Sequence, residues 1–176
     1  MTGEVTLRPA TTGDAAALAA LAREAFVAAF GPLYRPEDLE AFLSGYRTEE
    51  AYRTKLADPN VRVQLALIDG ALGGYVLIVL GEAIEGRPDP QPARPVFLSQ
   101  LYCASHATGR GLGASLMDWV LAQARAWDAD AVQLSVYSEN FGAQRFYQRY
   151  GFAHVADIDF WVGEKRDDEF LYELRL

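Results

Sequence analysis

A glycine-rich turn between a strand and a helix is the feature that most constrains how this chain folds. The strand covers 96–103, and the turn reads Gly-Arg-Gly-Leu-Gly-Ala over 109–114. Glycines at alternate positions let the backbone approach a ligand closely, with several N–H groups pointing one way. At a helix N-terminus such donors form an anion site suited to a pyrophosphate. The candidate ligand-binding residues are Gly109, Arg110, Gly111, Leu112, Gly113 and Ala114, with Arg110 able to add a charge-assisted hydrogen bond.

Three other interpretations of this turn compete. Taken alone, the pattern is most simply a tight turn with close helix–strand packing, because short glycine motifs also match by chance. A dinucleotide-binding Rossmann fold would use an acid near Asp130, but its glycine motif normally follows the first strand. A P-loop needs a Lys-Ser/Thr ending that this turn lacks. The Rossmann and P-loop interpretations are therefore rejected.

The remaining pattern predicts the order of the elements. Apolar runs and turn residues predict strands at 5–8, 61–68, 72–80, 96–103, 132–136, 152–162 and 169–176. Helical spacing predicts helices over 14–30, 112–127 and 140–150, and two short helices within 35–57 that divide near Ser44-Gly45. The proline-rich stretch 86–95 is predicted to be a loop. This order is typical of an α/β fold with a mixed sheet of about seven strands, in a single domain over 1–176.

A second motif lies in the last predicted helix. Asn140 and Tyr147 are seven positions apart, about two helical turns, so they share one side of that helix. Each alone has a structural explanation, since Asn is a preferred helix cap and Tyr is often half-buried. Only the combination with the glycine turn gives the two residues a functional interpretation.

Together the two runs resemble the GNAT superfamily of N-acetyltransferases, which move an acetyl group from acetyl-CoA to a primary amine. The matching runs are 109–114 and the Asn140, Ala143, Phe146-Tyr147 and Gly151-Phe152 positions, and the element order matches across nearly the whole chain. The resemblance implies a mixed, mostly antiparallel sheet flanked by helices, with a splayed strand pair at the acetyl-CoA site. Thr108 departs from the family, which often has Gln or Arg there.

The resemblance also implies a role for each matching residue. The CoA pyrophosphate would bind the amides of 109–114, and the pantetheine arm would run beside Leu101, Tyr102 and Cys103 like an added strand. Asn140 would hydrogen-bond the pantetheine region, and Tyr147 would donate a proton to the departing thiolate. The acetyl group would pass directly to the amine in a ternary complex. Cys103, despite His106 and His154, is then a small strand residue rather than a nucleophile.

The residue that deprotonates the amine has no obvious position. An alkylamine has a pKa near 10, so a carboxylate acting through water is expected. Some relatives carry Glu at the strand position that Ser135 occupies here. The candidates are Glu82, Glu139, Asp157 and Asp159, each of which is more simply explained as an ordinary surface acid. The mixed-charge run 164–169 is predicted to be a solvated turn.

A narrower resemblance concerns the acceptor. The segments 26–34, 101–102 and 160–163, with Asp168, are similar to bacterial polyamine N-acetyltransferases of the spermidine type. That subfamily often has His where Asp159 precedes Phe160. The expected substrate is a small, cationic, polyamine-like amine. The alternatives are a non-catalytic acetyl-CoA-binding module of the same fold, and a protein N-terminal or lysine acetyltransferase.

The charge balance bears on possible partners. Lys and Arg number 16 against 24 Asp and Glu, a net charge of −8, which argues against nucleic acid and anionic membranes. A single cysteine, no signal-peptide core and no apolar run of roughly 18 residues predict a cytoplasmic, membrane-free protein. Two separated histidines predict no metal site, and a homodimer is left open. The acids Glu37, Asp38, Glu40, Glu49 and Glu50 indicate a cationic acceptor only if they face the cleft.

Overall fold

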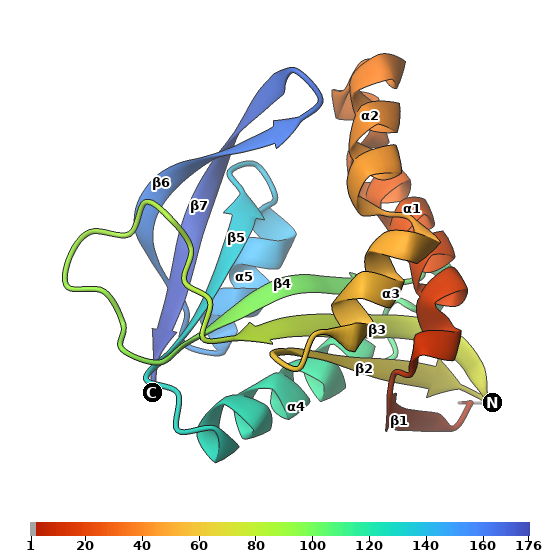
Figure 1. Cartoon of the computed structure of the whole chain (residues 1–176), viewed down its shortest axis with the longest axis horizontal. Helices are drawn as coiled ribbons and strands as arrows, with labels where there is room; N and C mark the ends of the chain where they lie inside the picture. Colours follow the sequence, from red (N-terminus) through yellow and green to blue (C-terminus); the bar gives the residue numbers. More distant parts are fainter. Residues whose placement is uncertain (1–2) are drawn as a thin grey trace.

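A mixed sheet of seven strands runs through residues 3–176, the part of the chain that the computed structural model describes. The strands are β1 (Val5–Pro9), β2 (Val61–Ile68), β3 (Ala71–Leu80), β4 (Pro95–Cys103), β5 (Ala131–Tyr137), β6 (Ala153–Val162) and β7 (Lys165–Arg175). They pair in the order β1-β2-β3-β4-β5-β7-β6, and every neighbouring pair is antiparallel except β4–β5 (Figure 1). The predicted mixed, mostly antiparallel sheet is confirmed.

The parallel pair β4–β5 separates soon after it forms. Its register covers only Pro95 to Phe97 of β4, although β4 continues to Cys103. On the other side of β4 the pairing with β3 shifts, so that Ser99 is an extra residue between two paired positions. Such a bulge bends a strand and increases its twist. The splayed strand pair that the resemblance implied is therefore present, because the β4–β5 ladder ends at Phe97, two residues before this bulge.

Helices cover both faces of the sheet. They are α1 (Ala15–Phe30), α2 (Pro36–Tyr46), α3 (Glu49–Ala57), α4 (Leu112–Ala126) and α5 (Phe141–Arg149). α1 and α3 pack on one face of β2 to β4, and α4 crosses the opposite face (Figure 1). The predicted division between α2 and α3 near Ser44-Gly45 is wrong by a few residues. The break falls at Thr48, whose side chain caps α3 by accepting from the Ala51 N–H at 3.1 Å.

The first helical stretch is more apolar than the sequence pattern suggested. Residues Thr12–Leu33 form a segment long and apolar enough to cross a membrane by length and composition. One face of this segment packs against the sheet, where Leu18 and Ala22 are fully buried. The core helix of a soluble protein meets the same criterion. Packing on the sheet accounts for the apolar residues of this one face.

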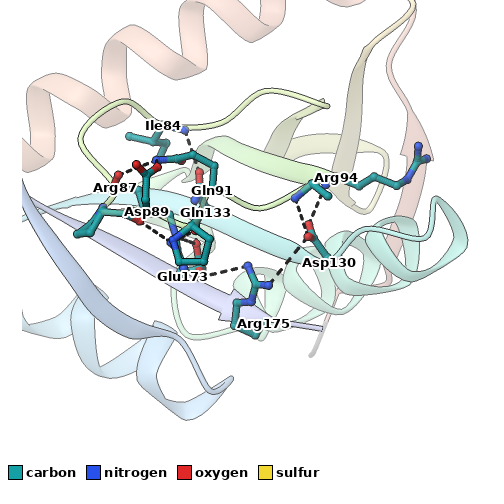
Figure 2. Close-up of polar contacts among 12 residues, drawn as sticks. Ile84, Arg87, Asp89, Gln91, Arg94, Asp130, Gln133, Glu173 and Arg175 are labelled. Carbon is teal, nitrogen blue, oxygen red and sulfur yellow. Dashed lines mark hydrogen bonds and ion pairs between the residues drawn. The ribbon is translucent and has the colours of Figure 1, made fainter.

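The proline-rich loop after β3 is held to the sheet by buried polar contacts (Figure 2). Arg87 donates to Glu173 on β7, with Nη2 2.8 Å from Oε1, and the Gln133 amide donates to Glu173 at 2.8 Å. Burial alone would raise the pKa of Glu173, but these two hydrogen bonds outweigh it and hold that pKa below its ordinary value. Asp130 accepts from the backbone N–H groups of Ala93 and Arg94, so it anchors this loop.

The end of the chain differs from its prediction. The charged run 164–169 is not a solvated turn, because the turn includes only Gly163 and Glu164 and β7 begins at Lys165. Alternation along β7 points Asp167 and Glu169 inward, where both are buried. Residues 165–169 are all charged, so the sequence shows no alternation of apolar and polar residues that would predict a strand there.

We expect Arg87→Ala to lower the free energy of unfolding by about 3 kcal/mol, because it removes the nearest cation from the buried Glu173 carboxylate and leaves it only the Gln133 amide and the more distant Arg175. The matched control is Arg53→Ala, which removes an exposed pair with Glu49 on α3 and should cost less than about 1 kcal/mol. Urea denaturation at pH 7 measures both. Equal losses for the two variants would contradict a structural role for the Arg87–Glu173 pair.

Candidate active site

A cavity of about 720 Å³ lies where β4 and β5 separate. Its walls include residues 97–103 of β4, 134–137 of β5, and side chains from α1, α2, α5 and the β6–β7 hairpin. Beyond Phe97 the β5 side of β4 has no ladder partner among the described residues, so backbone N–H and C=O groups are available there. The predicted donor-binding residues Leu101, Tyr102 and Cys103 all line this cavity.

Tyr147 and Asn140 both reach the cavity from α5. The Tyr147 hydroxyl has no hydrogen-bond partner within residues 3–176, and the side chain is only partly buried. Burial raises the pKa of Tyr147, with smaller contributions from Tyr102 and Cys103, so the phenol stays protonated at neutral pH. Asn140 caps α5, since its Oδ1 accepts from the Ala143 N–H at 3.2 Å. Its amide N–H groups remain for other partners.

Cys103 also lines the cavity, at the last position of β4. Burial raises the pKa of its thiol, which lowers the fraction of reactive thiolate. Neither His106 nor His154 is among the lining residues, and His154 Nε2 lies 2.8 Å from Asp157 instead. This geometry favours the interpretation of Cys103 as a packing residue.

The glycine turn lies beyond the end of β4, outside the cavity lining. Gly109 and Gly111 have φ of 77° and 76°, a left-handed conformation that other residues rarely adopt. The buried Leu112 anchors the turn in the core, and Arg110 is exposed. The first N–H groups of α4 precede its first intrahelical bond, from Ser115 to the Gly111 carbonyl. They are suitable donors for an anion at the helix N-terminus.

Glu169 is the residue that sequence reasoning missed. Among the described residues that line the cavity it is the only carboxylate, and it is 9% exposed. Burial raises its pKa to about 7, although the Ser135 hydroxyl donates to it at 2.9 Å and opposes the shift. Ser135 is the position where some relatives of the resembled family carry Glu. The carboxylate therefore comes from the neighbouring strand β7, and strand alternation from 165 onward was the signal that could have found it.

The four proposed bases do not reach the cavity lining. All are exposed: Glu82, Glu139, Asp157 and Asp159. Glu139 accepts from the Tyr137 hydroxyl at 2.7 Å, and Asp159 pairs with Arg166. Each of the four is therefore in the surface role that the sequence also allowed.

The acids of the variable helices do not face the cavity either. Glu37, Glu40, Glu49 and Glu50 are exposed and absent from its lining. Asp38 is buried at the start of α2, where its carboxylate pairs with Arg35 and accepts from the Glu164 N–H at 2.9 Å. The net charge of −8 thus carries no information about the acceptor.

Asp38 also holds the far wall of the cavity in place. It docks the tip of the β6–β7 hairpin, which lies beside α2 in Figure 1. Gly163 permits this contact, because a Cβ there would lie 2.5 Å from the Asp38 Cα. Below this contact, aromatic side chains from α1, α2 and β6 pack together, including Phe26, Phe42 and Phe160. These aromatic rings line the part of the cavity away from α5.

Residues 3–176 contain no group of three or more His, Cys, Asp or Glu side chains placed to hold a metal ion.

Comparison with solved structures identifies the architecture. The fold is similar to a PaiA N-acetyltransferase from Thermoplasma acidophilum that was crystallised with coenzyme A. The TM-score is 0.77 at 18% sequence identity, over 98% of this chain and 99% of that one. At this identity the likeness concerns the fold alone.

Comparison with sequences identifies the family. The model of the family described as "Acetyltransferase (GNAT) family" matches residues 19–152. An uncharacterized N-acetyltransferase of Mycobacterium tuberculosis is 32% identical over 158 residues, which are 90% of this chain and 95% of that protein. A probable spermine N(1)-acetyltransferase of Bacillus subtilis subsp. natto is 32% identical over 71 residues, 40% of this chain and 46% of its own. Because the family match covers more than half of the chain and a relative matched over most of its length agrees with it, this chain belongs to the GNAT family of acetyltransferases.

Proposed function

We propose that this acetyltransferase moves an acetyl group from acetyl-CoA to a primary amine of a small acceptor, by direct attack in a ternary complex. One observation carries the proposal: a single cavity is lined by the open edge of β4, by Tyr147 and by the buried carboxylate of Glu169. The three supply what amine acetylation needs, namely a place for the thioester, an acid for the thiolate and a base for the ammonium.

The donor would bind along β4 and the glycine turn. Residues 109–114 would hold the pyrophosphate through the free N–H groups of α4 and through Arg110. The pantetheine arm would pair with the unpaired backbone of Leu101 to Cys103, as a strand added to a sheet edge. Backbone N–H groups there would also stabilise negative charge on the thioester oxygen. Asn140 would donate from its amide, since its oxygen already caps α5.

Tyr147 and Glu169 would divide the proton transfers. Tyr147 keeps its proton at neutral pH and has no competing partner among residues 3–176, so it would protonate the departing thiolate. Glu169, with a pKa of about 7, is largely ionised just above neutrality and would accept the ammonium proton through water. The two groups thus begin in opposite protonation states just above neutral pH, the phenol as an acid and the carboxylate as a base.

A polyamine-like acceptor is one candidate for the amine. The similarity of 71 residues to a probable spermine acetyltransferase supports it. The charges of the cavity lining do not support it. Within the described chain the lining has one carboxylate, Glu169, and two cationic side chains, Arg47 and Lys55. A groove for a polyamine needs several anionic contacts.

A cytoplasmic location and a homodimer remain proposals. The β6 strand is an edge of the sheet and offers ten residues for pairing with a second copy. Size-exclusion chromatography with light scattering measures whether such a dimer exists.

A thiol-release assay with acetyl-CoA and a panel of polyamines, aminoglycosides, amino acids and peptides tests the function. Turnover with any amine supports an enzyme. Binding of acetyl-CoA without turnover on the panel would instead favour a non-catalytic acetyl-CoA-binding module. The free Tyr147 hydroxyl and the buried Glu169 favour the enzyme, since a binding module has no need of either.

Tyr147→Phe should lower kcat about 100-fold or more, because the thiolate then leaves without a proton donor. The affinity for acetyl-CoA, measured by calorimetry, should change little. Tyr150→Phe is the control on the same helix, since that hydroxyl contacts the Ala114 carbonyl rather than the cavity. Unchanged turnover of Tyr147→Phe at saturating substrates would refute the general-acid role.

Glu169→Gln should lower kcat about 100-fold and remove the limb of the pH–rate profile near 7, below which the carboxylate is protonated. Ser135→Ala should move that limb to higher pH, because it removes the hydrogen bond that lowers the pKa of Glu169. Glu139→Gln is the control outside the cavity and should leave the profile unchanged.

A stability measurement separates this effect from misfolding. Folding raises the pKa of Glu169 from 4.5 to about 7, so the wild type loses stability as pH rises through that interval. Glu169→Gln lacks this loss and should melt at or above the wild-type temperature at pH 8. A variant that is less stable there, with the pH limb retained, would exclude Glu169 as the base.

Gly111→Asp should weaken acetyl-CoA binding at least tenfold more than Gly111→Asn, measured by calorimetry. Both side chains have nearly the same shape and tolerate the left-handed conformation at this position, but only Asp adds charge against the phosphates. Equal affinities for the two variants would place the pyrophosphate elsewhere.

A further inference from the structure

Arg47, the first residue after α2, is a buried cation without an acidic partner in the described chain. Its side chain is buried, with 8% of the residue exposed. Nη1 donates to the Tyr46 carbonyl at 3.2 Å and Nη2 to the Tyr102 hydroxyl at 3.3 Å. Nε has no partner among residues 3–176. A guanidinium has five N–H donors, so three of the five are left without an acceptor.

Arg47 lies at the cavity, where a substrate would bind. It lines the same cavity as Tyr147 and Glu169. Its guanidinium carbon lies 5.0 Å from the centre of the Phe42 ring and 5.9 Å from that of Tyr102, on the open edge of β4. The pyrophosphate site proposed above lies outside this cavity, so the CoA phosphates do not account for the unpaired charge.

Packing alone does not explain an arginine here. The two aromatic faces attract the cation, which offsets part of the cost of removing it from water. They accept no N–H group of Arg47, and the buried Nε–H is costly to leave without an acceptor. An apolar side chain of similar length would fill the same space between Phe42 and Tyr102 without that cost. The guanidinium of Arg47 is therefore placed to bind an anion in the cavity.

We propose that Arg47 binds a carboxylate of the acceptor, so that the substrate is an amino acid rather than a polyamine. This inference rests on the proposed amine acetylation and names its substrate class. Glu169 on β7 faces the same cavity with the opposite charge, which matches an acceptor that carries both an amine and an acid. The aromatic wall of Phe26, Phe42 and Phe160 favours an apolar or aromatic side chain.

Matched pairs of amines test this directly. Phenylalanine is compared with 2-phenylethylamine, and leucine with 3-methylbutylamine, so that each pair differs only by the carboxylate. Wild-type kcat/KM should favour the amino acid by about 10- to 100-fold, the range of a charge-assisted hydrogen bond. Arg47→Met should abolish this preference by slowing the amino acid, with the simple amine and acetyl-CoA affinity little changed.

Two further variants guard against loss of the fold. Arg47→Lys retains the charge without the planar fork and should keep an intermediate preference. Arg53→Gln changes an exposed arginine of α3 outside the cavity lining and should behave as wild type. A wild-type preference for the simple amine or for spermidine would overturn the proposal, and so would an unchanged preference in both Arg47 variants.

A binding measurement distinguishes failure of this inference from failure of the enzymatic function. The probe is 3-phenylpropanoate, which has the carboxylate and the ring but no amine. If no amine is acetylated, binding of this probe to the wild type and its loss in Arg47→Met would support the anion site while the enzymatic proposal fails. If amines are acetylated but the probe binds both proteins equally or neither, the carboxylate site is overturned.

Discussion

The separation of β4 from β5 is the constraint on which the rest of the structure depends. The two strands pair only through Phe97, and a bulge at Ser99 follows in the pairing of β4 with β3 on the other side. Beyond Phe97, the backbone N–H and C=O groups of β4 that would pair with β5 in a continuous sheet have no such partner, and a cavity opens between the strands. The proposed acid Tyr147, the proposed base Glu169 and the open edge of β4 proposed for the donor all lie around this one interruption.

Segments far apart in the chain complete the site because the sheet brings their ends together. Tyr147 enters from α5, Glu169 from β7 and Arg47 from the end of α2. The Asp38 contact with Gly163 and the Glu164 N–H holds the β6–β7 hairpin against α2. The hairpin that carries Glu169, the proposed base, is therefore held by a turn and a helix start that line no part of the cavity.

Much of the fold and part of the site were predictable from local patterns. The order of strands and helices and the cavity positions of Tyr147 and Cys103 agree with the structure. Two local errors were made, at the α2–α3 boundary and in the run 164–169. Both arise where charged side chains conceal the pattern: Lys165 to Glu169 alternate in direction, but every member is polar, so apolar periodicity is absent.

By itself, the sequence determined the family-like element order, the glycine turn at the start of α4 and the seven-residue spacing of Asn140 and Tyr147. These depend on near neighbours in the chain, where backbone conformation and helical periodicity decide the outcome. Only the tertiary structure decided which acid enters the cavity and which arginine stays unpaired there. The burial of Glu169, and the lack of an acidic partner for Arg47 among the described residues, depend on residues far away in the sequence that the fold brings together.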